Sequence, residues 1–219
     1  MATQLNLEEQ EQLDQLKHFW RRWGNAITWL LIAVLAAFAA WNGWNYWQRK
    51  QASEAAVMFD EVERAAQAKD LPKLDRALSD IRERYSATTF AQQSALLAAK
   101  TYQDEKQADK AQAALVWVAE KSPDEGLRAV ARLRVAGLML DAKAYDQALQ
   151  QLSAKFSPEF EALVADRRGD IYLAQGKPAE AKAEYLKAHA GLDPQTEYRM
   201  LVEVKLNALG GQVPIEDKK

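Results

Sequence analysis

The sequence contains few side chains whose type and spacing could carry out a reaction. None of its 219 residues is a cysteine, which excludes disulfide bonds, thiolate metal ligands and a cysteine nucleophile. It also lacks a glycine-rich phosphate loop, a serine nucleophile elbow and a His-Glu-x-x-His zinc motif. Of the two histidines, we interpret His18 as an interface residue beside an apolar segment and His189 as a surface or helix-end residue. The sequence therefore predicts no enzymatic activity, no cofactor and no metal.

Pairs of arginines are the other residues that suggest binding. Arg167 and Arg168, like Arg132 and Arg134, could bind acidic groups of a partner. Acidic residues such as Asp170 occur close by in the sequence, so ion pairs within the chain are the favoured interpretation. The net charge of −2 gives no strong electrostatic reason to expect a nucleic acid partner.

The composition is that of a helical protein. Alanine supplies 40 of the 219 residues, while the chain has only 9 glycines and 6 prolines, which argues against a disordered or loop-rich chain. In residues 51–219, apolar residues recur at steps of three and four, and no strand-like alternation stands out. This pattern predicts an all-helical domain.

A charge-free segment near the N-terminus predicts a transmembrane helix over residues 23–48. Its 26 residues exceed the roughly 20 helical residues that span the apolar layer of a bilayer. Six of the seven tryptophans lie in or beside it, and amphipathic aromatic rings favour the headgroup region at both membrane interfaces. The predicted interface residues are Trp20, Trp23, Trp41, Trp44 and Trp47.

Two other interpretations of this segment are less favoured. The small-x-small pattern Ala37-Phe38-Ala39 resembles a signal-peptidase site, but the segment stays apolar and aromatic as far as Trp47. A helix lying on the membrane surface needs a charged face, which the segment lacks.

The flanking charges predict the orientation of the segment only weakly. Lys17, Arg21 and Arg22 precede it, whereas Arg49 and Lys50 follow it. Because positive charges favour the cytoplasmic side, we expect residues 1–22 to be a cytoplasmic tail and the long C-terminal part to be exported.

Helix-start signals recur with a period in the C-terminal part. Ser122-Pro123, Ser157-Pro158 and Asp193-Pro194 each resemble an N-cap followed by proline in the first turn, and Ser86 occupies the place of an earlier one. The spacings of 36, 35 and 36 residues are close to the period of about 34 of tetratricopeptide repeats, which contain two helices each. We predict an all-α fold: an N-terminal transmembrane helix followed by a tetratricopeptide-like α-solenoid of about three to four helix pairs.

The packing residues of the repeats follow the same period. Each unit has a large residue, an alanine nine positions later and another large residue four further on. The sets are Tyr102, Ala111 and Leu115; Met139, Ala148 and Leu152; and Tyr172, Ala181 and Tyr185. The third unit also carries Gly169, where the other two have Ala99 and Ala136, and Gly176 is expected to end its first helix.

These features divide the chain into segments. Residues 49–85 are expected to form a linker and an atypical first helix pair that breaks at Leu71-Pro72, and residues 86–192 the repeats. Residues 193–211 are expected to contain a capping helix, and residues 212–219 a flexible tail.

A partner of such a solenoid is expected on the concave face, which the first helix of each pair lines. Repeat geometry places seven side chains there: Leu96, Lys100, Leu133, Leu140, Asp166, Asp170 and Leu173. The alternative for Leu96, Leu133 and Leu140 is burial between neighbouring repeats.

The whole arrangement resembles the YfgM family, ancillary subunits of the bacterial SecYEG translocon. The resemblance rests on Trp44-Asn45-Tyr46-Trp47 at the end of the anchor, followed in order by residues 131–136 (ARLRVA), 165–170 (ADRRGD) and 204–209 (VKLNAL). It implies a protein of the bacterial inner membrane with periplasmic repeats. It further implies association with SecYEG and with PpiD, a membrane-anchored periplasmic chaperone of the prolyl isomerase type, and no catalytic residues.

The function implied by the resemblance is a non-enzymatic, membrane-anchored interaction module that helps to hand exported proteins to periplasmic folding factors. Two alternatives share the same architecture. One is an independent holdase that binds unfolded exported proteins directly, and the other is a scaffold for envelope assembly or cell division.

Overall fold

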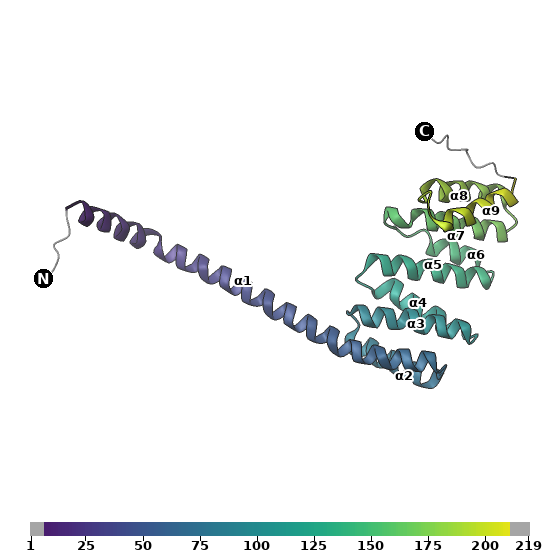
Figure 1. Cartoon of the computed structure of the whole chain (residues 1–219), viewed down its shortest axis with the longest axis horizontal. Helices are drawn as coiled ribbons and strands as arrows, with labels where there is room; N and C mark the ends of the chain where they lie inside the picture. Colours follow the sequence, from purple (N-terminus) through teal and green to yellow (C-terminus); the bar gives the residue numbers. More distant parts are fainter. Residues whose placement is uncertain (1–6, 211–219) are drawn as a thin grey trace. The chain divides into compact units, whose positions relative to one another are not determined.

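The computed structural model describes residues 7–210, so the tail predicted at residues 212–219 lies outside the described residues. All regular structure within that range is α-helical, which confirms the predicted fold class (Figure 1). The helices are α1 (Leu7–Gln67), α2 (Leu71–Tyr85), α3 (Thr89–Asp104), α4 (Ala108–Lys121), α5 (Glu125–Asp141), α6 (Tyr145–Gln151), α7 (Pro158–Ala174), α8 (Pro178–Gly191) and α9 (Glu197–Ala208). The chain forms two compact units, Met1–Gln51 and Ala52–Lys219, and each is described by itself.

The first unit contains the apolar part of α1. Among the described residues, this is the one helix that is long and apolar enough to cross a membrane. Almost none of its most apolar stretch is buried, whereas a core helix of a globular protein would be covered on at least one face. The five predicted interface tryptophans are between 49% and 67% exposed.

The region expected to be a linker after residue 48 is helical as far as Gln67. The break between the first two helices falls at residues 68–70, before Leu71-Pro72 and not at it. Asp70 is the N-cap of α2 and its carboxylate accepts a hydrogen bond from the amide of Lys73. Proline therefore lies in the first turn, where its missing N–H leaves no intrahelical hydrogen bond unmade.

In the second unit, successive helices pack against one another in pairs, and α9 follows the last pair. The first helix of each pair ends in the same turn. Lys69, Lys106, Lys143 and Gly176 have left-handed backbones, with φ between 53° and 74°. In the turn after α3, the amide of Gln107 donates to the carbonyl of Tyr102 and that of Lys106 to Gln103, which is a Schellman motif.

The predicted helix starts are correct at one of four positions. Ser157 is the N-cap of α7 and is followed by Pro158, as expected. The other N-caps are Thr88, Asp124 and Thr196, not Ser86, Ser122 and Asp193.

The misplaced caps lie in turns that precede the helices. Oδ1 of Asp193 accepts a hydrogen bond of 2.8 Å from the amide of Gln195, two residues on, and Oγ of Ser122 accepts one of 3.2 Å from Asp124. A short polar side chain can stabilise such a turn as readily as it caps a helix. Ser122-Pro123 and Asp193-Pro194 therefore mark loops between repeats, and α5 and α9 begin a few residues later.

The predicted packing sets lie in the core of the repeats. Ala111, Ala148 and Ala181 are fully buried, and the large residues beside them are buried or half-buried. Gly169 is needed where α7 meets α8, because a Cβ atom there would lie 2.5 Å from the ring of Tyr185.

The pair formed by α5 and α6 is the least regular, because α6 has only seven residues. At the C-terminal end of α6, the carbonyl of Leu152 accepts a hydrogen bond of 2.6 Å from Nη2 of Arg168 in α7.

Candidate functional site

The predicted partner face on the first helices is only partly open. Leu96, Leu133 and Leu140 are half-buried and pack against the main hydrophobic core, as the burial alternative anticipated. Lys100 is exposed and forms an ion pair of 2.9 Å with Asp104 on the same helix. Leu173, which is 42% exposed, is the member of the set that presents apolar surface to solvent.

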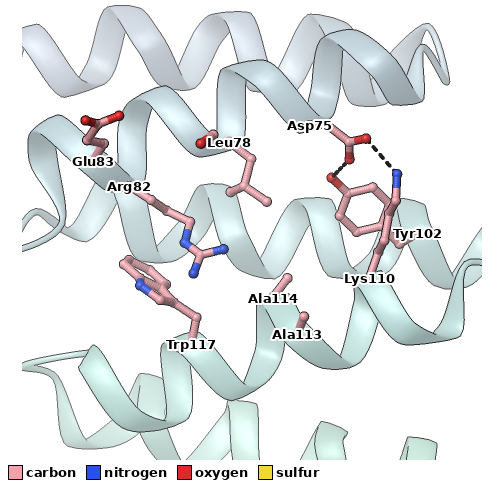
Figure 2. Close-up of a pocket in the computed structure, with 10 residues that line it drawn as sticks. Asp75, Leu78, Arg82, Glu83, Tyr102, Lys110, Ala113, Ala114 and Trp117 are labelled. Carbon is pink, nitrogen blue, oxygen red and sulfur yellow. Dashed lines mark hydrogen bonds and ion pairs between the residues drawn. The ribbon is translucent and has the colours of Figure 1, made fainter.

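A groove of about 530 Å³ lies on the second-helix side, between α2 and α4 (Figure 2). At one end, the guanidinium of Arg82 lies over the ring of Trp117, 4.6 Å from its centroid. At the other end, Asp75 accepts hydrogen bonds of 2.6 Å from the hydroxyl of Tyr102 and from Nζ of Lys110. Sequence analysis missed this groove, although Trp117 is the seventh tryptophan, the one that lies outside the anchor region.

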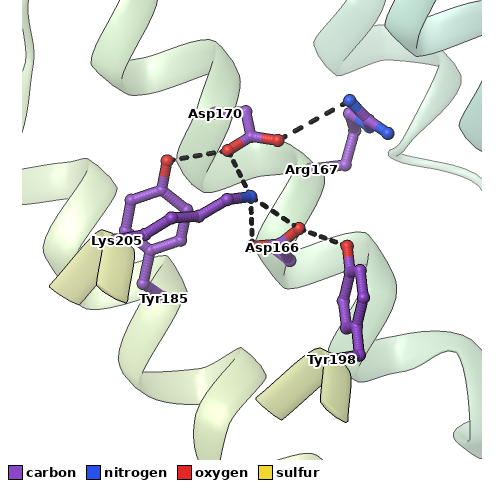
Figure 3. Close-up of polar contacts among 6 residues, drawn as sticks. All are labelled: Asp166, Arg167, Asp170, Tyr185, Tyr198 and Lys205. Carbon is purple, nitrogen blue, oxygen red and sulfur yellow. Dashed lines mark hydrogen bonds and ion pairs between the residues drawn. The ribbon is translucent and has the colours of Figure 1, made fainter. Parts of the chain in front are cut away.

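The two predicted aspartates, Asp166 and Asp170, are brought together in a network that joins α7 to α8 and α9 (Figure 3). Nζ of Lys205 lies 2.8 Å and 2.9 Å from the two carboxylate oxygens of Asp166 and 2.7 Å from Oδ1 of Asp170. The hydroxyl of Tyr198 donates to Asp166 at 2.6 Å, and that of Tyr185 donates to Asp170 at 2.8 Å.

This network corrects the prediction that Asp166 faces a partner. Asp166 is 1% exposed, because α9 supplies the cation and the hydroxyl that cover it. Arg167 lies 3.6 Å from Asp170, so the favoured interpretation of this arginine as an internal ion-pair partner is confirmed. Burial, and then the hydrogen bonds to the aspartates, raise the pKa values of Tyr185 and Tyr198 above their ordinary value.

His189 is also internal, which corrects its interpretation as a surface residue. It lies in the last turn of α8, as the helix-end interpretation proposed, but it is only 5% exposed. Its Nε2 lies 2.9 Å from Oε1 of Glu203 and accepts a hydrogen bond of 3.0 Å from Nε of Arg199. Both partners belong to α9, so this residue helps to attach the last helix.

The last helix is apolar on two sides. Val202 and Leu206 are fully buried against α8, whereas Met200, Leu201 and Val204 are 58%, 48% and 64% exposed. A helix that only covers the end of a solenoid is expected to have a polar outer face. The outer face of α9 is therefore a candidate contact surface. The signal in the sequence is that α9 carries apolar residues on the exposed face as well as on the buried face.

No group of three or more His, Asp or Glu side chains within residues 7–210 is arranged to hold a metal ion. The polar clusters around Asp166 and His189 are closed by ion pairs and hydrogen bonds between helices, and they join α7, α8 and α9.

The fold and its surfaces define the class of the protein: a tetratricopeptide-like helical domain whose chain also carries one helix suited to a membrane. A family described as a tetratricopeptide repeat-like domain matches residues 17–211. The chain belongs to the YfgM family, as the order of its motifs and the following relatives both indicate.

Three relatives bear the name ancillary SecYEG translocon subunit. The protein of Neisseria gonorrhoeae is 32% identical over 93% of this chain and 98% of its own length. That of Haemophilus influenzae is 28% identical over the same shares, and that of Escherichia coli is 29% identical over 55% of this chain and 58% of its own length. No solved structure matches the chain.

Proposed function

We propose that this chain is a non-enzymatic, membrane-anchored interaction module that associates with the SecYEG translocon and with a PpiD-type periplasmic chaperone. It would help to pass exported proteins from the channel to periplasmic folding factors. The observation that carries the proposal is the end-to-end similarity to ancillary SecYEG translocon subunits, which covers 98% of the length of two relatives. A match of this extent includes both the apolar helix and the repeats.

The proposed location is the bacterial inner membrane, with a single pass over residues 23–48. Residues 1–22 would lie in the cytoplasm and the repeats in the periplasm. The charges of Lys17, Arg21 and Arg22 before the span, against Arg49 and Lys50 after it, support this orientation.

The proposed mechanism is placement, because nothing in the site suggests chemistry on a substrate. An anchor that holds the repeats beside the channel exit turns the encounter with a partner into a local event at high effective concentration. The partner would use surfaces that are open in the second unit, such as Leu173 and Lys100 on the first-helix face.

The test is purification of the tagged chain from native membranes in a mild detergent, followed by identification of the proteins that accompany it. Recovery of SecY and of a PpiD-type chaperone supports the proposal. A control chain, in which an unrelated single-pass helix replaces residues 23–48, shows whether the anchor or the repeats make the contact. Recovery of cell-wall enzymes in place of SecY would favour an envelope scaffold and contradict the proposal.

One observation favours the holdase alternative, namely the exposed apolar face of α9 formed by Met200, Leu201 and Val204. A holdase should slow the aggregation of a chemically unfolded reporter protein without any partner present. Replacement of these three residues by serine should abolish that protection, whereas the matched exposed change Val57→Ser should not. If the unmodified chain gives no protection, the holdase function is excluded.

A further inference from the structure

Two side-chain pairs with the same sequence separation join α2 to α4. Asp75 contacts Lys110 and Arg82 contacts Trp117, and each pair is separated by 35 residues. The equal separation means that the two helices run parallel in register. Seven residues separate the two pairs along each helix, which corresponds to about 10.5 Å. The groove of about 530 Å³ between the helices extends along this length (Figure 2).

The two ends of the groove differ in how their charges are satisfied. At the first end, Asp75 is matched by a cation and a hydroxyl. Partial burial opposes its ionisation, but the hydrogen bonds from Lys110 and Tyr102 hold its pKa below the ordinary value. The negative charge at this end is therefore already paired within the chain.

At the second end, no carboxylate of the described residues pairs with Arg82. Glu83 lines the rim of the groove but forms no ion pair with this guanidinium. Partial burial lowers the pKa of Arg82 from its ordinary value, so the cation has lost hydration without gaining an anion. The guanidinium lies over the ring of Trp117, and its N–H groups can still donate hydrogen bonds to a ligand.

The floor between the two ends is made of small and apolar side chains, which are Leu78, Ala113 and Ala114. A length of about 10.5 Å fits about three residues of extended chain. A phosphate group would need several converging donors, whereas this groove offers one free guanidinium beside an apolar surface. Charge and shape therefore match a carboxylate flanked by aliphatic side chains.

We propose that the groove between α2 and α4 binds an extended segment of another polypeptide, with a Glu or Asp side chain of that segment paired to Arg82 and its aliphatic neighbours on Leu78, Ala113 and Ala114. The inference does not depend on the translocon, because it rests on the chemistry of the groove alone. A failed pull-down of SecY would leave it standing, and a failed peptide titration would leave the proposed function standing.

The test uses the full chain in detergent micelles and a labelled peptide, Gly-Ser-Ala-Leu-Ala-Glu-Ala-Leu-Ser-Gly, with both ends blocked. Fluorescence anisotropy measures its dissociation constant. Incorporated 5-fluorotryptophan locates the site by ¹⁹F NMR, and the change Trp117→Phe assigns the signal of that ring. We expect saturable binding with a dissociation constant below about 1 mM, and we expect the bound peptide to shift the ¹⁹F signal of Trp117.

Matched controls isolate the carboxylate–guanidinium pair. A peptide with Gln in place of Glu should bind about tenfold or more weakly, as should the variant Arg82→Gln with the original peptide. Arg76→Gln, an exposed charge change on the same helix, should leave binding within about twofold of the unmodified chain.

Three outcomes would overturn the inference: no saturable binding, equal binding of the Glu and Gln peptides, or binding that leaves the Trp117 signal unmoved. The peptide comparison is made on the unmodified chain, so it decides the matter even if Arg82→Gln disturbs folding.

Discussion

The contact between Gly169 and Tyr185 allows a prediction whose size follows from the structure. A Cβ atom at residue 169 would lie 2.5 Å from two ring atoms of Tyr185 and 3.0 Å from a third, where ordinary contacts begin at 3.4 Å. The ring must therefore move by about 1 Å to admit a methyl group. It cannot do so freely, because Tyr185 is 1% exposed and its hydroxyl is fixed to Asp170.

We expect Gly169→Ala to lower the free energy of unfolding by about 2 kcal/mol. Overpacking of a rigid core site costs about 3 kcal/mol, and the better helix propensity of alanine returns about 1 kcal/mol. Gly137→Ala is the matched control, because residue 137 lies inside α5 and a Cβ atom there would meet only the end of Arg167, at 3.8 Å. The control should raise the free energy of unfolding by about 0.5–1 kcal/mol.

The repeats themselves suggest a compensating change. Where the third tetratricopeptide-like repeat has Gly169 opposite Tyr185, the first repeat has Ala99 with Leu115 and the second repeat has Ala136 with Leu152. In a chain that carries Tyr185→Leu, we therefore expect Gly169→Ala to cost nothing or to be favourable. The coupling in this double-mutant cycle should be about 2–3 kcal/mol.

The assay is urea unfolding of the full chain in detergent, followed by circular dichroism at an unchanged detergent concentration. If Gly169→Ala and Gly137→Ala change the free energy of unfolding equally, the close approach of α7 and α8 does not limit residue 169. If Tyr185→Leu gives no rescue, the repeat positions are not equivalent and the assignment of the third unit is wrong.

Three further predictions concern the turns and the network of the last helix. Lys143→Gly should raise the free energy of unfolding by about 1 kcal/mol, because φ at this residue is 59°; Lys143→Ala should give no gain in the same urea titration. Lys205→Met should lower it by about 3 kcal/mol, because it leaves the buried carboxylate of Asp166 without a cation, and amide exchange should rise first in α9. Stability should fall as the pH rises above about 10, because the unfolded chain then releases tyrosine protons that the folded chain retains on Tyr185 and Tyr198; Tyr198→Phe should flatten that dependence in urea titrations between about pH 9 and 11.

The sequence was most informative where one physical requirement acts on residues close together. A charge-free run of 26 residues has few uses other than a membrane span, and Gly176 has the left-handed backbone expected at the end of α7. The spacing of Gly169, Ala181 and Tyr185 likewise matched the packing residues of a repeat, and in the structure this glycine lies where α7 closely approaches the ring of Tyr185.

The parts that escaped prediction depend on residues far apart or on signals with two meanings. A serine or aspartate before proline favours both a helix cap and a turn, and here two of the three such pairs, Ser122-Pro123 and Asp193-Pro194, lie in turns. Three of the four left-handed turns that end the first helices of the pairs use lysine, which carries no signal for that backbone. Asp166 looked like a surface carboxylate because its cation, Lys205, lies 39 residues away in a helix whose position the sequence does not specify.

The repeat spacing explains why the groove at Arg82 and Trp117 occurs only once in the repeats that the structure describes. The left-handed turns at Lys69, Lys106 and Lys143 recur every 37 residues, so one step further along the chain the residues equivalent to this pair are Ala119 and Ala154. Neither alanine can supply a cation or an aromatic ring, and Ala119 is buried. The regular period thus supplies the parallel helices, and an arginine and a tryptophan at positions where the next repeat has alanine supply the binding chemistry. An interaction site in a degenerate solenoid is therefore best sought where a repeat position departs from its packing residue without gaining an internal partner.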